Sequence, residues 1–196
     1  MFVPYDPYLR QDPLRVTRNR FLQRITDPAS EPLTLSDTKL YLRVDNTDDD
    51  TLITNLITAA RMIAENWLRR SLITQSWKLA YDLGIPESIW LPMGPVTSLT
   101  SVVLVNMDST TQTIDSSTYW LNAAQNALIM FGCLIGFRIE ITYTAGYADA
   151  DNVPMPIKQG MLAHIAAMYD NRGDAGDDVL PAQSVGLYTP YREIRL

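Results

Sequence analysis

Residues 48–70, DDDTLITNLITAARMIAENWLRR, decide the fold class of this chain of 196 residues. Apolar side chains recur there at three- and four-residue spacing, which is the periodicity of one helix face. The main stripe is Leu52, Leu56, Ala59, Ile63 and Trp67, and a second row widens it, namely Ile53, Ile57, Ala60, Ala64 and Leu68. Aspartates open the stretch and arginines close it, as the helix dipole favours. We predict a helix over 48–70, roughly 34 Å long.

The segments upstream of this helix are shorter or less regular. Ser36 is suited to cap a short helix that runs to about Arg43, with Asp37 in its first turn. Residues 1–32 are rich in proline and arginine and show no sustained period, so we expect an extended arm. Within that arm, residues 16–25 could also form one or two helical turns.

The middle of the chain has the two-residue alternation of β-strands. Trp77, Leu79 and Tyr81 alternate with polar or small residues, and residues 137–147, FRIEITYTAGY, are the clearest strand. Gly146 should end that strand, because glycine takes positive φ at little cost. Further strands are expected at 89–91, 101–107, 119–121 and 127–131, with a turn over 108–113.

A second long helix should begin at Pro154 and Pro156, where a missing N–H costs nothing, and should end near residue 173. Its stripe is Ile157, Met161, Ile165 and Met168. The order of elements predicts an α+β fold: an N-terminal helical pair, a central antiparallel β meander, then a long helix and an extended tail. We expect the helices to cover one side of the sheet. The expected domains are an arm at 1–32, an α+β domain at 33–173 and a flexible tail at 174–196.

Composition excludes several classes of protein. The net charge of −6 and a pI near 4.7 weigh against tight binding to nucleic acid, which requires lysine and arginine. No apolar run is long enough for a transmembrane helix, and the N-terminus lacks the apolar core of a secretory signal. The single cysteine, Cys133, excludes an intramolecular disulfide and is expected to be a buried small hydrophobe in a reducing cytoplasm.

No set of residues has the spacing of a catalytic, cofactor or metal site. A calcium loop that starts at Asp45 would need glycine where Asp50 stands and glutamate where Leu56 stands, so the acidic run is better explained as a helix start. His164 is the only histidine and lies on or beside an apolar helix face. Neither a nucleophile elbow nor a phosphate-binding glycine loop occurs. We therefore expect no enzyme activity, no cofactor and no metal.

The C-terminal tail is the strongest candidate for partner binding. A glycine- and aspartate-rich linker is followed by apolar, aromatic and basic residues, the composition of interface anchors. The candidate anchors are Leu187, Tyr188, Tyr191, Arg192 and Ile194. The alternative is that this tail folds back onto its own domain.

Five segments together resemble one family, the head–tail connector (adaptor) proteins of tailed bacteriophages and gene transfer agents. They are LTLSDTKLYLRVDNTDDDTLITNLITAARMIAENWLRRSL (33–72), IWLPMGPVTSLTSVVL (89–104), ITYTAGY (141–147), VPMPIKQGMLAHIAAMYDNR (153–172) and LYTPYREIRL (187–196). The resemblance covers residues 33–196 and leaves the N-terminal arm unmatched.

The resemblance implies a structural ring, typically of twelve subunits, between the portal and the tail of a phage-like particle made in the bacterial cytoplasm. The implied partners are further copies of the chain, the portal protein and a tail-side stopper or tail terminator. DNA would pass through the ring without specific binding, no membrane would be involved, and the tail anchors would face the portal. A tail or baseplate module with a carbohydrate- or protein-binding β surface is the alternative. An exposed cluster of tryptophan and carboxylate side chains would favour that alternative, whereas burial of His164 would discard a small hydrolase.

Overall fold

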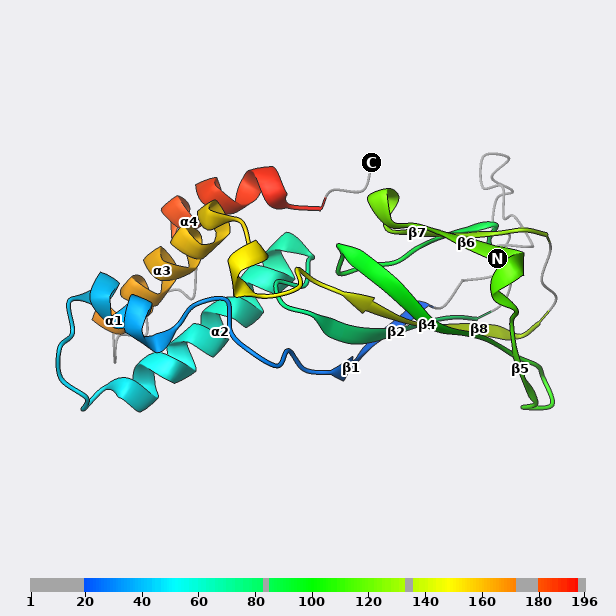
Figure 1. The fold of residues 1–196 in the computed structure, drawn as a ribbon, viewed down its shortest axis with the longest axis horizontal. Helices are drawn as coiled ribbons and strands as arrows, with labels where there is room; N and C mark the ends of the chain where they lie inside the picture. Colours follow the sequence, from blue (N-terminus) through cyan, green and yellow to red (C-terminus); the bar gives the residue numbers. More distant parts are fainter. Residues whose placement is uncertain (1–19, 83–84, 133–135, 172–179, 194–196) are drawn as a thin grey trace, which may run out of the picture.

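Two separate apolar cores divide the chain into a helical module and a β module. The computed structural model describes residues 20–82, 85–132, 136–171 and 180–193. The helices lie at one end of an elongated molecule and the strands at the other (Figure 1). None of the helices in this described part is long and apolar enough to cross a membrane.

The helical module consists of four helices that bury one shared core. They are α1 (Leu35–Leu42), α2 (Asp50–Leu68), α3 (Met155–Asp170) and α4 (Ala182–Tyr188). The core includes Ile53, Ile57 and Leu68 of α2 and Ile157, Met161 and Ile165 of α3. Both long helices were predicted, and both end within three residues of the predicted positions.

Two details of the predicted helices differ from the structure. Thr34, not Ser36, caps α1: its Oγ1 accepts the N–H of Asp37 at 3.0 Å, because the helix already starts at Leu35. The burial of the two apolar rows of α2 is also the reverse of the prediction. The second row is buried, whereas the predicted main stripe is half-buried or exposed, with Ile63 39% exposed.

The β module is a sandwich of two antiparallel sheets instead of one meander. The large sheet has the strand order β1-β2-β8-β4-β5 and the small sheet the order β3-β7-β6. The strands are β1 (Arg20–Thr26), β2 (Gln75–Asp82), β3 (Ser88–Trp90), β4 (Val96–Val105), β5 (Thr111–Thr113), β6 (Tyr119–Asn122), β7 (Ala127–Met130) and β8 (Arg138–Ala145). Leu79 and Ile141 of the large sheet and Ile89 and Leu128 of the small sheet share the core between them.

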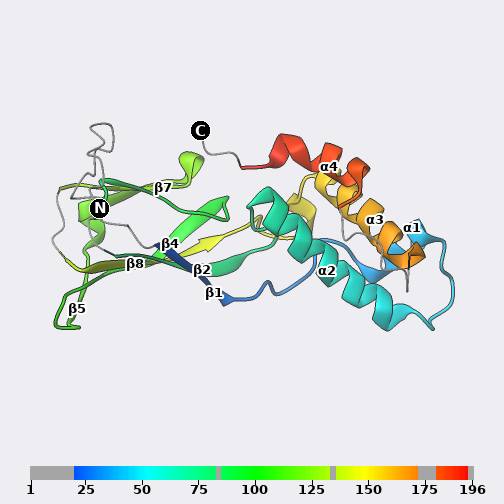
Figure 2. The same cartoon turned by 180° about the vertical axis from the view of Figure 1, so that it is seen from behind.

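This sandwich explains why the predicted layering is wrong although the α+β class is confirmed. Helices were expected to cover one face of a sheet. The apolar face of the large sheet is instead buried by the small sheet, and its other face carries ion pairs such as Lys78–Glu140. Because the small sheet covers the apolar face of the large sheet, the helices form their own core beyond the end of the strands (Figure 2).

Several predicted boundaries can be placed on this fold. Residues 20–25 belong to the edge strand β1 and not to a helical turn, because Leu22 faces the sandwich core in register with Leu79. Gly146 ends β8 as predicted, at φ 124°, where a Cβ would lie 2.3 Å from the Ile73 carbonyl oxygen. Residues 1–19 of the expected arm (1–32), Cys133 and the linker at 172–179 lie outside the described residues. Short 3₁₀ helices join the elements at Ser116–Thr118, Ala123–Gln125, Ala150–Asn152 and Thr189–Tyr191.

Candidate assembly surfaces and the polar hub that orients them

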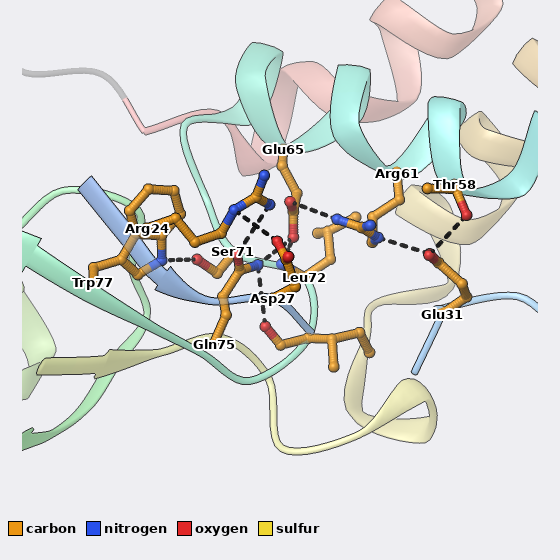
Figure 3. Close-up of polar contacts among 11 residues, drawn as sticks. Arg24, Asp27, Glu31, Thr58, Arg61, Glu65, Ser71, Leu72, Gln75 and Trp77 are labelled. Atoms are coloured by element: carbon orange, nitrogen blue, oxygen red, sulfur yellow. Dashed lines mark hydrogen bonds and ion pairs between the residues drawn. The ribbon is translucent and has the colours of Figure 1, made fainter. Parts of the chain in front are cut away.

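A buried polar hub joins the helical module to the β module (Figure 3). Arg61 of α2 binds Glu31 at 2.7 Å and Glu65 at 3.1 Å. Glu65 also accepts the backbone N–H of Leu72 at 2.9 Å and the Gln75 side-chain amide of β2 at 2.7 Å. The hub therefore connects the loop before α1, helix α2 and the first residues of the large sheet.

Burial governs the electrostatics of this hub. Glu65 is 3% exposed, and burial raises the pKa of its carboxyl although Leu72, Arg61 and Gln75 oppose the shift. Burial alone would lower the pKa of Arg61, but its hydrogen bond to Glu31 and the charges of Glu65 and Glu31 raise it above the ordinary value. The Gln75–Glu65 hydrogen bond joins α2 directly to β2, so the hub ties the helical module to the large sheet.

The C-terminal segment forms a second connection between the modules. The Arg70 Nε donates to the carbonyl of Tyr191 at 2.7 Å, and the Arg192 guanidinium stacks 4.8 Å from the Trp67 ring centroid. The Glu193 Oε1 accepts from Trp90 Nε1 at 3.2 Å and from Asn126 Nδ2 at 3.0 Å. Residues 189–193 thus run from the helices to the small sheet.

The predicted tail anchors differ in how far they are available to a partner. Tyr188 is fully buried in the helical core: its ring packs 5.9 Å from Trp67 and lies against Gly160, where a Cβ would be 2.4 Å from Tyr188 Cε1. Leu187 and Tyr191 are half-buried, Arg192 is exposed, and Ile194 lies outside the described residues. The expectation of a tail free of its own domain is therefore wrong for residues 180–193, because Tyr188 fills the space that Gly160 leaves open.

His164 and the aspartates of the acidic run, which the sequence offered as candidates for a catalytic or metal site, lie in the helical module. His164 is 6% exposed on α3, and burial lowers its pKa. This burial discards the hydrolase hypothesis, which needed an accessible imidazole. Asp49 accepts the Tyr169 hydroxyl and Asp50 binds Lys39, so both take part in helix packing. Among the described residues, no group of three or more histidine, cysteine, aspartate or glutamate side chains could hold a metal ion.

Comparisons with known proteins place the chain in a family. Residues 32–127 match the family model of the phage gp6-like head-tail connector protein. Residues 32–127 of the chain belong to this head–tail connector family. The match starts where the resemblance seen in the sequence starts, and it confirms that resemblance. A search of curated proteins finds no significant match.

Solved structures share the connector fold over nearly the whole chain. A chain in the neck of an empty gene transfer agent (GTA) particle, computed with C6 symmetry, has a TM-score of 0.75 at 21% identity. The match covers 90% of this chain and 97% of the GTA chain. A chain in the virion of a native GTA particle scores 0.75 at 22% identity, covering 89% and 96%. A chain in the neck of a native GTA particle, computed with C12 symmetry, scores 0.73 at 22% identity, covering 90% and 97%.

This connector exposes apolar side chains on both modules. One group is the α2 outer face, which we define as Leu52, Leu56, Ala59, Met62 and Ile63, with Asn55 and Asn66 at its rim. Another is the outward face of the small sheet, where Trp120 is paired with Ile129 and lies beside Phe131. Phe21 and Ile25 on β1 and Leu40 on α1 are further examples.

Neither the hub nor these exposed apolar surfaces were predicted from the sequence. Arg61 and Glu65 are four residues apart on a helix, a spacing also typical of solvent-exposed ion pairs, so their burial had no signal in the sequence. The α2 outer face did leave a signal. Between Asp50 and Arg69, the only charged side chains are the two that the hub buries.

Proposed function

We propose that this chain is a non-enzymatic adaptor subunit that forms a ring at the head–tail junction of a phage-like particle. The observation that carries this proposal is the family match over residues 32–127, which spans the helical pair and half of the β module. GTA neck chains with the same fold were computed with C6 and C12 symmetry, which supports a ring of about twelve copies. Its location would be the neck of the particle, after synthesis in the bacterial cytoplasm.

We propose the portal protein on one side of the ring and a stopper or tail terminator on the other as partners. The net charge of −6 suits a ring through which DNA moves without being held, because tight binding would need clusters of lysine and arginine. The buried hub supports a structural role, since it holds the two modules at one angle and so presents the same outline in every copy.

The portal-binding part of the proposal now rests on fewer residues than the sequence indicated. Arg192 is exposed and Leu187 and Tyr191 are half-buried, so these three can contribute to a contact without unfolding α4. Tyr188 can do so only if it leaves the helical core, where it is fully buried. We therefore expect the portal to contact the outer surface of α4 and the residues that follow it.

The alternative of a carbohydrate-binding module lacks a supporting observation. Trp120 is 53% exposed, but the strands of the small sheet, β3, β6 and β7, contain no aspartate or glutamate. Glu193, whose carboxylate accepts from Trp90, is half-buried, and so is Trp90, so this pair is not an exposed cluster. Sugar recognition by a β surface would need such hydrogen-bonding groups beside the tryptophan ring. The small sheet therefore does not favour carbohydrate binding.

The decisive test is electron microscopy of particles that carry a small fused tag on this chain. The proposal expects tag density at the neck, in a closed ring, and expects particles without the chain to lack attached tails. Tag density at the baseplate, or normal tailed particles without the chain, would refute it.

Two truncations test the tail separately. Deletion of residues 194–196 keeps every contact described for Tyr188, Tyr191 and Glu193, so the purified chain should keep its Tm. Deletion from residue 186 onward removes Tyr188 from the core and should lower stability by about 3–5 kcal/mol, the usual cost of a lost large aromatic side chain. A portal-binding defect in the shorter deletion would assign the anchor to the last three residues.

A further inference from the structure

The α2 outer face is an uncharged apolar strip along a helix of about five turns. Met62 is 43% and Ile63 39% exposed, and Leu52, Leu56 and Ala59 are half-buried beside them. Single exposed apolar residues are common on protein surfaces, but here they lie next to one another at three- and four-residue spacing. The strip is therefore one continuous surface.

The distribution of charge on α2 differs from that of a helix facing water. A solvent-exposed helix face normally carries charged side chains. On α2, Asp50 binds Lys39, while Arg61 and Glu65 are buried in the hub. The outer face has only Asn55 and Asn66 as polar residues at its rim. Depletion of charge with exposed methionine is typical of the buried centre of a protein interface.

The edge of the large sheet adds to the same side of the molecule. In both ribbon views, α2 and β1 lie on the lower side, whereas α4 and the small sheet lie on the upper side (Figures 1 and 2). Within the described part of the chain, β1 pairs with β2 on one edge and with no strand on the other. Phe21 and Ile25 of β1 are 62% and 49% exposed. Proteins usually cover such an edge.

We propose that a second copy of this chain covers the α2 outer face. This inference rests on the proposed ring. In a ring of identical subunits, each copy must present two different surfaces that fit each other. The chain has a second apolar surface on its upper side, because β3, β6 and β7 contain no charged residue and Trp120, together with Phe131 just after β7, is exposed. Of the charged groups near these strands, Arg20 and Glu193 both contact Trp90.

Other occupants fit this face less well. DNA would need a cluster of lysine or arginine, and the α2 outer face has neither. On β1, Arg24 pairs with Asp27 and Arg20 stacks on Tyr81 and Trp90. In the two ribbon views this side runs along both modules, so its occupant must extend along both. A neighbouring copy is the partner that extends over the same length.

A photo-crosslinking experiment tests the contact directly. Benzoylphenylalanine is placed at position 63 of the full-length chain, and particles assembled with it are irradiated. We expect a product of twice the 22.1 kDa of a single chain, in which both peptides come from this chain. A crosslink to another protein, or no crosslink in particles that contain the chain, would overturn the proposal.

A pair of matched variants tests the energetics. Ile63→Glu introduces a charge into the face, and Thr54→Glu introduces the same charge nine residues earlier, on the opposite side of α2. Both purified chains should fold, with Tm values close to that of the natural chain. Ile63→Glu should reduce incorporation into particles roughly tenfold or more, as for a central interface residue, and Thr54→Glu should not. Equal incorporation of the two variants would contradict the inference.

These results also separate the inference from the proposed function. If the tagged chain lies at the neck but position 63 crosslinks to a portal or tail protein, the adaptor role survives and the subunit contact is elsewhere. If the tagged chain is absent from the neck, the adaptor role itself fails.

Discussion

The buried face of α2 and the α2 outer face are made of similar apolar side chains, yet their surroundings are opposite. Ile53, Ile57 and Leu68 meet α3 and the turn before β2 inside the helical core. Ile63 and Met62, on the other side of the same helix, meet no comparable core. The buried face also includes Arg61 and Glu65, the two charged residues that α2 contributes to the hub. The difference indicates that apolar side chains at helical spacing can face a partner in the same chain, as on the buried face, or in another copy, as we propose for the outer face.

Removal of the hub carboxylate should have the largest effect on the buried side. Glu65→Ala would leave the Leu72 N–H without its acceptor, the Gln75 amide with only the Ile73 carbonyl, and Arg61 with only Glu31. We expect a loss of about 3–5 kcal/mol, as for other buried ion pairs that lose one partner. The loss is measured as the change in the free energy of unfolding in urea. Glu140→Ala, which breaks the more exposed pair with Lys78, serves as control and should cost about 1 kcal/mol or less.

An aliphatic truncation on the buried face should have the next largest effect. Ile57 is 3% exposed, so Ile57→Ala removes buried methylene groups and leaves a cavity in the helical core. The expected loss is about 2–4 kcal/mol in chemical denaturation. A value near zero would show that α2 and α3 repack freely, and the contrast between the two faces would then disappear.

The same truncation on the outer face should cost little in the isolated chain. Ile63→Ala removes a side chain that water already reaches, and we expect a loss below about 1 kcal/mol. Particle assembly should be more sensitive than stability to this change. A loss as large as that of Ile57→Ala would mean that the outer face is covered within the monomer, contrary to the structure.

The smallest effect concerns the pH dependence contributed by His164. Burial lowers the pKa of this imidazole in the folded state, so the unfolded chain binds a proton more readily. Stability should therefore fall as pH drops from above the unfolded pKa of about 6.5 toward the lower folded pKa. Tm measured between pH 7.5 and 5.5 should decrease less in His164→Gln than in the natural chain. Identical slopes in the two proteins would show that other groups dominate this range.

Much of the fold followed from local pattern. The two long helices, most strands between Trp77 and Tyr143 and the turn at Gly146 were predictable, because apolar periodicity and glycine conformation are local properties. The short strand β5 was not, since it lies within the predicted turn at 108–113. The family was also recognisable, since its motifs occur in order along the chain. The candidate partner-binding residues stay a prediction: Arg192 is exposed, whereas Tyr188 belongs to the core.

Only the tertiary structure decided which surfaces meet. The sequence determined that α2 has two apolar rows, but the side that faces α3 depends on how the hub orients Arg61 and Glu65 toward β2. The sequence determined that apolar and polar side chains alternate along the strands. The division of the strands into two sheets depends instead on pairings between residues as distant as Val96 and Ala145. Such long-range contacts depend on shape and buried area summed over many residues, which a single local pattern does not encode. For the same reason, Tyr188 became a core residue: the space above Gly160 exists only once α3 and α4 lie side by side.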